Sequence, residues 1–149
     1  MDQKDREILR ILQRDASLSM TELADRCALS KTAVWRRVRE LESQGVIRGR
    51  ITVLDPEELG FGLMIFAFVR TSQHSDKWFA RFERAVTSIP EILECHRTSG
   101  DIDYLLRVVA EDMRHYDEIY KRLIREVDFA DISSTFVMET IKAGTELPI

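Results

Sequence analysis

Basic side chains and one tryptophan are concentrated between residues 26 and 50. This stretch holds seven Lys or Arg residues against two Glu residues, and residues 31–39 read KTAVWRRVR. Arginine can pair bidentately with guanine or phosphate, and threonine can contact a thymine methyl group or a phosphate. A local net charge of about +5 therefore indicates a phosphate-binding surface, with a simple solvated helix face as the alternative.

The same stretch has the apolar periodicity of a helix with one buried side. At 100° per residue, Val34, Val38 and Leu41 fall on one narrow face, which must pack inward. An exposed indole among arginines has little structural use on the opposite face, so we interpret that face as the part that enters the major groove of DNA. The DNA-binding candidates of this helix are Ser30, Lys31, Thr32, Trp35, Arg36, Arg37 and Arg39.

Two preceding segments are expected to position this helix. Apolar residues recur at helical spacing within residues 2–14, which predicts a first helix. Ser19 and Glu22 fit a capping box that begins a short second helix. Ser30 fits the N-cap of the third helix, and Gly45 supplies the left-handed residue that ends it. Together these elements predict a helix-turn-helix.

A β-branched stretch, residues 46–54, follows the third helix and ends at an Asp-Pro turn. It predicts a short wing or hairpin in which Arg48 and Arg50 contact backbone phosphates. Alternatively, the two arginines only protect an exposed strand edge. The first domain is thus expected to be a winged helix-turn-helix over residues 1–55, with a hinge at residues 56–60.

Residues 61–149 alternate between strand-like and helix-like patterns. The expected order is βαββαβ, which is the ferredoxin-like α+β arrangement with four antiparallel strands and both helices on one face. In the first helix of this half, Phe79, Phe82, Val86 and Ile89 are expected to face inward. Strands are expected at residues 63–69, 92–98, 103–110 and 132–141, and helices at 75–89 and from about 112 to 127.

The first of these strands is apolar on both faces. Two helices can cover only one face, which leaves Met64, Phe66 and Phe68 on the other. We expect a second copy of the chain to bury that face, giving a two-fold dimer with sheet packed on sheet. Such a dimer sets two recognition helices at a fixed separation, which suits a roughly palindromic site on double-stranded DNA.

The charge of the 149-residue chain is distributed unevenly. Its formal net charge is -4, from 22 Lys and Arg against 26 Asp and Glu. Residues 1–55 nevertheless carry 11 basic and 9 acidic residues, whereas residues 56–149 carry 11 basic and 17 acidic. The whole-chain value argues against a nucleic-acid partner, but the charge of the first part supports one.

Several protein classes have no support in the sequence. It has no run of about 20 apolar residues and no signal-peptide pattern, so we expect a cytoplasmic protein without a membrane partner. Cys27 and Cys95 suggest neither a disulfide framework nor a metal site, and no cofactor is expected. An enzyme using Asp101 and Asp103 as acid and base lacks a catalytic motif. A plain interaction module would leave the arginine-rich helix without a purpose.

Two separate stretches resemble the Lrp/AsnC, or feast/famine, transcriptional regulators. Residues 19–42 are similar to the helix-turn-helix of that family. Residues 99–106, SGDIDYLL, are similar to its amino-acid-sensing domain, and residues 136–139, FVME, to its last strand. The resemblance covers essentially the whole chain. Residues 78–89 and 143–149 resemble the branch that includes cysteine-responsive regulators.

The resemblance implies a regulator that binds promoter DNA as a dimer or as a higher assembly of dimers, often an octamer, with an amino-acid effector altering assembly or DNA affinity. It places the effector at contacts between subunits. There Asp101 or Asp103 would accept from the ammonium group of the effector, and Gly100, Ser134 or Thr135 would donate to its carboxylate. The full set of implied effector residues is Ser99, Gly100, Asp101, Asp103, Tyr104, Ser133, Ser134, Thr135 and Val137.

Simpler roles remain open for three of the polar residues in this half. Asp101 would then only favour a turn, and Asp103 would only satisfy backbone amides. His96 has a polar core or interface role as its main alternative.

Overall fold

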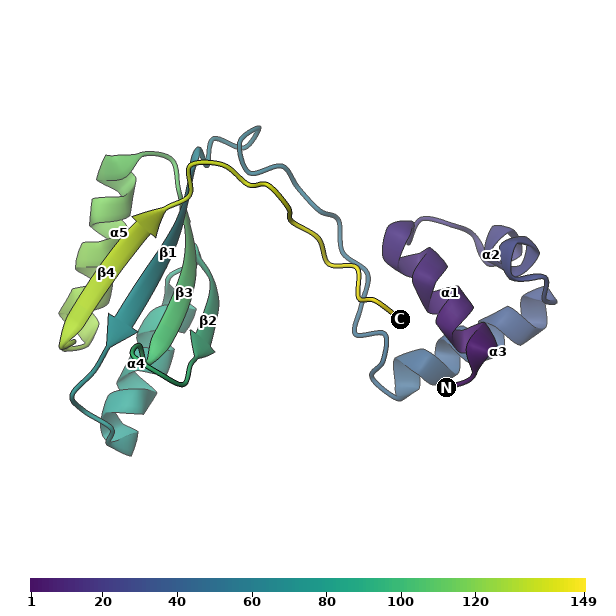
Figure 1. Cartoon of the computed structure of the whole chain (residues 1–149), viewed down its shortest axis with the longest axis horizontal. Coiled ribbons are helices and arrows are strands. Elements are labelled where there is room, and N and C mark those ends of the chain that lie inside the picture. Colours follow the sequence, from purple (N-terminus) through teal and green to yellow (C-terminus); the bar gives the residue numbers. More distant parts are fainter. The chain divides into compact units, whose positions relative to one another are not determined.

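The computed structural model describes all 149 residues and divides them into two units (Figure 1). Unit 1 consists of Met1–Val53 together with Ile141–Ile149, and unit 2 of Leu54–Thr140. The expected boundary after residue 55 differs from this division by two residues. The final segment differs more, because the sequence assigns residues 141–149 to the second domain and the structure packs them with the first. Residues 56–60, expected as a hinge, form a turn inside unit 2 in which the Phe61 amide donates to the Pro56 carbonyl at 2.8 Å.

Unit 1 contains three helices, α1 (Gln3–Arg14), α2 (Met20–Cys27) and α3 (Lys31–Ser43). Both expected caps are present: Ser19 and Glu22 form a reciprocal capping box, and the Ser30 hydroxyl accepts from the Ala33 amide at 3.2 Å. Such caps satisfy amides that the first helical turn leaves without a partner. The predicted helix-turn-helix is confirmed, and its core contains Ile8, Leu23, Ala24, Cys27, Val34 and Val38.

The turn between α2 and α3 depends on a left-handed residue. Ala28 has φ 50° and ψ 49°, and its amide donates to the Ala24 and Asp25 carbonyls. It is the one non-glycine residue with positive φ. At the other end of α3, Gly45 has φ +72°, as expected for a helix end.

The expected wing is not a hairpin in this structure. Residues 46–54 contain no strand, and the Val46 and Ile47 amides instead donate to the Leu41 carbonyl at 2.9 and 3.1 Å. A β-branched stretch forms a strand only when another strand is available to pair with it. No strand of the chain pairs with residues 46–54.

Unit 2 has the predicted βαββαβ order. Its strands pair in the order β2-β3-β1-β4, and every pair is antiparallel. Ser75 caps the first helix of this unit and Asp112 caps the second. The last strand is shorter than expected, since it ends at residue 136 rather than at 141. The elements are β1 (Leu63–Arg70), α4 (Asp76–Ser88), β2 (Ile92–Arg97), β3 (Tyr104–Ala110), α5 (Met113–Glu126) and β4 (Asp131–Phe136).

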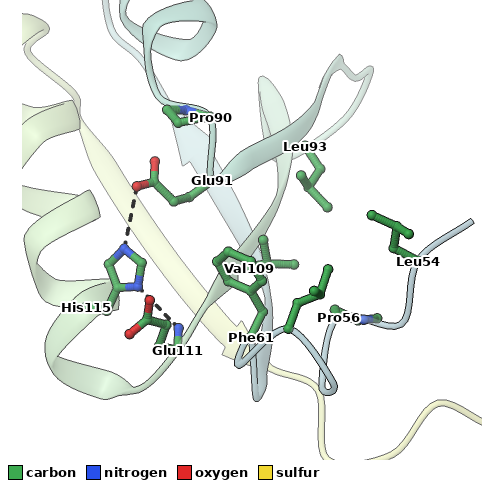
Figure 2. Close-up of a pocket in the computed structure, with 10 residues that line it drawn as sticks. Leu54, Pro56, Phe61, Pro90, Glu91, Leu93, Val109, Glu111 and His115 are labelled. Atoms are coloured by element: carbon green, nitrogen blue, oxygen red, sulfur yellow. Dashed lines mark hydrogen bonds and ion pairs between the residues drawn. The ribbon is translucent and has the colours of Figure 1, made fainter.

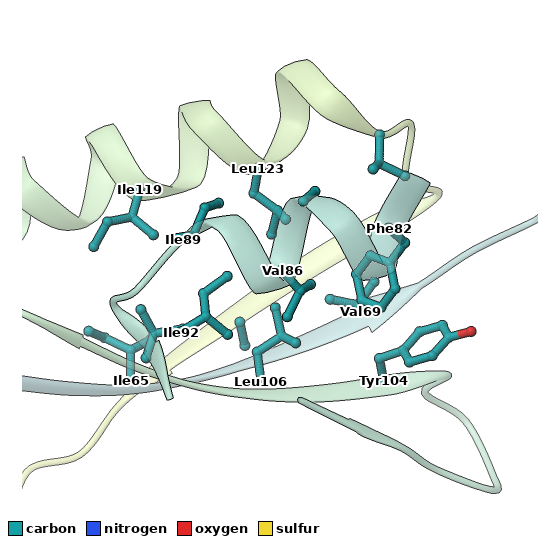
Figure 3. Close-up of a cluster of buried hydrophobic side chains, with 14 of the residues drawn as sticks. Ile65, Val69, Phe82, Val86, Ile89, Ile92, Tyr104, Leu106, Ile119 and Leu123 are labelled. Carbon is teal, nitrogen blue, oxygen red and sulfur yellow. The ribbon is translucent and has the colours of Figure 1, made fainter. Parts of the chain in front are cut away.

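The core of unit 2 lies between the sheet and both helices (Figure 3). Ile65 and Leu106 of the sheet meet Phe82 of α4 and the inner side of α5. The prediction that Phe79 faces the core is wrong. Phe79 is 45% exposed and the neighbouring Trp78 is buried in its place.

A specific hydrogen bond accompanies the burial of Trp78. Its ring stacks on Phe82 with centroids 5.1 Å apart, and its Nε1 donates to the Asp128 carbonyl at 2.8 Å. A buried indole needs a hydrogen-bond acceptor for its N–H group, whereas the ring of a phenylalanine has no polar group to satisfy.

The other face of the sheet carries no helix. The register pairs Phe66 with Arg107 and Thr135, and Phe68 with Leu105 and Ser133. Directly opposite residues share a face, so these side chains form one surface together with Met64 and Val109. We call this surface the open sheet face. Met64, Phe66 and Phe68 are half-buried there, whereas Ile65, Ala67 and Val69 on the helix side are buried, as predicted.

No helix in the chain combines the length and the apolar character needed to cross a lipid bilayer.

Candidate nucleic-acid interface and effector site

The residues predicted to contact DNA separate into two groups on α3. Val34, Val38 and Leu41 are buried, and the opposite side carries exposed side chains. We call this side the exposed α3 surface, formed by Lys31, Thr32, Trp35, Arg36 and Arg39.

Trp35 and Arg39 organise the middle of the exposed α3 surface. Trp35 is 53% exposed, and the Arg39 guanidinium carbon lies 5.5 Å from the centroid of its ring. Arg39 also lies 3.7 Å from a Glu42 carboxylate oxygen. A cation over an aromatic face is held without losing its charge, so Arg39 keeps a positive group at this surface. Arg36 has no ion-pair partner and extends into solvent.

Arg37 does not belong to the exposed α3 surface, contrary to the sequence prediction. Its Nη1 lies 2.7 Å from both an Asp2 and an Asp5 carboxylate oxygen. Asp2 and Asp5 also form the capping box of α1, so Arg37 ties α3 to the start of α1. The hydrogen bond from the Asp5 amide and the bond from Arg37 lower the pKa of Asp2. The pKa of Arg37 is raised in turn by its bonds to Asp5 and Asp2.

The two arginines after α3 are exposed, as a phosphate contact requires. Arg48 has no ion-pair partner, and Arg50 lies 3.4 Å from the Glu42 carboxylate. Glu42 is therefore shared between Arg39 and Arg50. It is a link between α3 and the following segment that the sequence analysis missed, because both contacts depend on the path of the chain after Gly45.

The turn between β2 and β3 presents three of the predicted effector residues. Ser99, Gly100 and Asp101 are exposed, Gly100 has φ +119°, and nothing lies within 4 Å of the place where its side chain would begin. The backbone carbonyl of Asp101 accepts from Arg70 Nε at 2.8 Å. The side-chain carboxylate of Asp101 has no hydrogen-bond or ion-pair partner within the chain. This turn therefore offers the Asp101 carboxylate as a hydrogen-bond acceptor beside an accessible backbone at Gly100.

Asp103 serves the fold of the same turn. Its carboxylate accepts from the Thr71 amide at 2.8 Å, and its own amide donates to the Val69 carbonyl at 2.9 Å. Asp103 therefore fixes the turn to the end of β1, which is the structural alternative considered from the sequence.

The remaining effector candidates do not gather beside this turn. Tyr104 belongs to the buried core, with its ring centroid 4.5 Å from that of Phe82, and burial raises the pKa of its phenol. Ser134 is hydrogen-bonded to the Tyr116 hydroxyl on the helix side. Ser133 and Thr135 lie on the open sheet face, and the Val137 amide donates to the Met64 carbonyl at the far end of β1. A single copy of the chain thus places these residues in three different environments.

His96 lies on the open sheet face. It is opposite Leu105, and its Nε2 lies 3.1 Å from the Glu94 carboxylate. Arg107, the neighbour of Phe66 across β1 and β3, also pairs with Glu94. A polar interface position, rather than an effector contact, is consistent with this placement.

Unit 2 also has a cavity of about 500 Å³ that the sequence analysis missed (Figure 2). Its wall is mostly apolar, and one edge is polar, where His115 lies 3.5 Å from Glu91 and accepts from the Glu111 amide through Nδ1. The Arg122 side chain pairs with the same Glu91 carboxylate at 3.1 Å. The lining residues are Leu54, Pro56, Leu59, Phe61, Pro90, Glu91, Leu93, Val109, Glu111 and His115.

The chemistry of this cavity differs from that of the β2–β3 turn. Burial raises the pKa of Glu91, but its backbone amide, Arg122 and His115 together hold it below its ordinary value. The polar edge is therefore anionic, and its nearby cation is already paired. A free amino acid would find an acceptor for its ammonium group there but no free cation for its carboxylate.

Two family models match the chain, one for each half. Residues 1–48 match the winged helix-turn-helix DNA-binding model, and residues 64–147 match the Lrp/AsnC ligand binding domain.

Individual relatives match over nearly the full length. The DNA-binding transcriptional activator DecR of Escherichia coli is 44% identical over 150 residues, which cover 100% of this chain and 99% of that protein. The crystal structure of an AsnC family transcriptional regulator from Agrobacterium tumefaciens is 48% identical with a TM-score of 0.95, covering 99% of this chain and 97% of that one. A transcriptional regulator from Neisseria meningitidis, solved as a complex with L-methionine, is 33% identical with a TM-score of 0.94 over 99% of this chain and 96% of that one.

Proposed function

The chain belongs to the Lrp/AsnC family of DNA-binding transcriptional regulators, and from this we propose that it reads promoter DNA through the exposed α3 surface. The observation that carries the proposal is the division of α3 into a buried stripe and an opposite side with Trp35, Arg36 and Arg39. Helix-turn-helix proteins insert such a helix into the major groove. Arg48 and Arg50 add phosphate contacts beside it.

Binding of promoter DNA is tested by the double variant Arg36→Ala/Arg39→Ala. Its affinity for the DNA upstream of its own gene should fall at least about tenfold, because a good base contact is worth about 1–3 kcal/mol. The slope of log affinity against log salt should also become shallower by about one for each phosphate group that an arginine no longer neutralises. Fluorescence anisotropy with labelled DNA at several salt concentrations measures both quantities.

A matched control removes the same charge from unit 2. Arg84 and Arg125 are exposed on α4 and α5 and have no ion-pair partner. The variant Arg84→Ala/Arg125→Ala should keep the affinity of the unmodified chain. Equal losses of affinity in the two double variants would show that net charge, and not the exposed α3 surface, determines binding.

We further propose that a second copy of the chain covers the open sheet face. Three large apolar side chains lie side by side there, and they stay half-buried in one copy. Sheet-on-sheet packing would bury them, and it would give the two DNA-binding units of the dimer a fixed relation to a roughly palindromic site. Further assembly of dimers, up to an octamer, is part of the same proposal.

The effector that we propose is a free amino acid held at the turn formed by Ser99, Gly100 and Asp101. The unpaired Asp101 carboxylate would accept from the ammonium group, and the open backbone at Gly100 would donate to the carboxylate. One relative of known structure is a complex with L-methionine, which supports this class of ligand. Because the turn is exposed in a single copy, residues of another copy would complete the site.

A thermal-shift screen of the twenty amino acids tests the effector class. A ligand present at 100 times its Kd adds about 2.7 kcal/mol of stability to the state that binds it. Asp101→Ala should abolish this shift while its DNA affinity without ligand is unchanged. Asp117→Ala, which removes an exposed carboxylate from α5, is the control and should keep both. A shift that persists in Asp101→Ala would contradict the assignment of this turn.

A further inference from the structure

Residues 146–149 lie against α1 of the DNA-binding unit. We call Glu146–Ile149 the latch. Unit 1 includes this segment although it is separated from α1 by more than 130 residues in sequence. In Figure 1 the segment ends beside α1.

One side chain of α1 binds the backbone of the latch twice. The Gln13 amide nitrogen Nε2 donates to the Leu147 carbonyl at 3.2 Å, and the Leu147 amide donates to Gln13 Oε1 at 2.7 Å. The side-chain amide thus satisfies both backbone groups of one residue, as a neighbouring strand would. This pairing recognises an extended backbone at a defined position.

Two arginines of the same helix hold oxygen atoms of the latch. Arg14 Nε lies 2.8 Å from a Glu146 carboxylate oxygen, and Arg10 Nε donates to the Ile149 carbonyl oxygen. Arg10, Gln13 and Arg14 lie within five residues of one another, and the first is three or four residues from the other two, so they project from one side of α1. That side matches an acidic segment in an extended conformation.

The apolar side chains of the latch face the segment that follows α3. Leu147 and Ile149 line a cavity of about 260 Å³ together with Leu9 and Leu12 of α1 and with residues 46–50. This last segment includes Arg48 and Arg50 and has no strand partner. The latch therefore adds a third wall to a segment otherwise supported by α1 and by two hydrogen bonds to Leu41.

We propose that the latch binds the groove between α1 and residues 46–50 and thereby holds Arg48 and Arg50 in position for DNA. The groove recognises an acidic residue followed by an extended backbone that carries two apolar side chains. Residues 137–145 join the latch covalently to β4, whereas hydrogen bonds and one ion pair attach the latch to α1. The consequence for DNA rests on the proposed function, whereas the latch itself does not.

Hydrogen exchange tests the latch without DNA. A full-length chain and a chain ending at Thr145 are compared at the Val46 and Ile47 amides, which donate to the Leu41 carbonyl. Removal of the latch should accelerate their exchange by about tenfold, since local opening no longer has to break the latch contacts. Gln13→Ala in the full-length chain should do the same to a smaller extent. Lys142→Ala, in the same segment of unit 1 but outside the latch, should change nothing.

A peptide in trans provides the complementary test. The hexapeptide Gly-Thr-Glu-Leu-Pro-Ile should restore slow exchange to the truncated chain, and the same peptide with Gln in place of Glu should restore less. Unchanged exchange after truncation overturns the latch. Equal rescue by the two peptides overturns the role given to Arg14.

The DNA measurement separates the latch from the proposed function. Truncation should lower the salt slope of DNA binding by up to about two, the value expected when two phosphate contacts, those of Arg48 and Arg50, are weakened. An unchanged slope together with faster exchange overturns the functional part of the inference. A full-length chain that binds no DNA refutes the proposed function, and the exchange experiment still decides whether the latch forms.

Discussion

Adjacent arginines on α3 lie in different environments. Arg36 extends into solvent, whereas Arg37 is held between the Asp2 and Asp5 carboxylates. The sequence predicts both as DNA contacts because residues one apart lie only 100° apart around a helix. Only the packing of α1 on α3 separates them, and the partners of Arg37 are 32 and 35 residues away.

Replacing Arg37 should therefore impair folding rather than recognition. Arg37→Ala leaves two carboxylates close together at the start of α1, and we expect a decrease of a few degrees in the Tm of unit 1. Arg36→Ala should leave the Tm unchanged. Differential scanning calorimetry distinguishes the two variants, and a lower Tm in Arg36→Ala would contradict the division of labour.

Asp2 should make the stability of unit 1 depend on acid pH. Its pKa is lowered in the folded state, so its contribution is complete above the unfolded pKa near pH 4 and is lost as the pH falls through the lower folded value. Asp15 and Glu22, whose pKa values are lowered by Ser17 and Ser19, act in the same direction. Urea unfolding of unit 1 should show decreasing stability below about pH 4.

Asp2→Asn is the matched variant for this pH dependence. Asparagine caps a helix about as well as aspartate but does not titrate. The variant should reduce the decrease below pH 4 without abolishing it, because the other two carboxylates remain. A pH profile identical to that of the unmodified chain would show that Asp2 contributes nothing.

The helices and strands differ in how well the sequence predicts them. Ser19, Ser30 and Ser75 all cap helices as expected, because a cap is decided within four residues. Residues 46–54 form no hairpin, because strand formation depends on a partner that local sequence does not reveal. In α4, helical periodicity allows either Phe79 or Trp78 to face inward, and the distant Asp128 carbonyl decides for Trp78.

A substitution at Ala28, in the turn of the helix-turn-helix, should increase the stability of unit 1. Ala28 adopts the left-handed conformation, which costs a residue with a Cβ about 1 kcal/mol or more. Ala28→Gly should remove this cost and stabilise unit 1 by up to about 1 kcal/mol, while Ala28→Val should destabilise it. Chemical denaturation measures both. A less stable Ala28→Gly variant would show that the cost is already offset by contacts of the Ala28 methyl group.

For the whole molecule, the open sheet face makes assembly a testable property. Phe66→Lys places a charge in the middle of that face without touching the helix-side core. The variant should fold, with unchanged circular dichroism, and sediment as a monomer at concentrations where the unmodified chain is a dimer. Ile124→Lys, which changes a 40% exposed residue of α5, should leave the sedimentation unchanged. Monomers of the unmodified chain at micromolar concentration would refute the dimer.

The sequence is informative about the order of elements and much less so about which residues of distant segments meet. The alternation of strand and helix patterns predicts the ferredoxin-like unit, because hydrophobic periodicity is a local property. The candidate effector residues come from one resemblance, but only the fold reveals that Tyr104 and Ser134 are used within unit 2 and that Ser99–Asp101 are accessible. The attachment of residues 146–149 to α1 has no local signal at all.

The two tryptophans give each unit its own fluorescent reporter. Trp35 lies half-exposed on α3, and Trp78 lies in the core of unit 2 with its indole nitrogen bonded to Asp128. Their emission should differ in wavelength, red-shifted for Trp35 and blue-shifted for Trp78. The Trp78→Phe variant keeps only the reporter on α3, and the Trp35→Phe variant keeps only the reporter in the core of unit 2. Changes at the α3 surface and unfolding of unit 2 can then be followed separately, each without an added label.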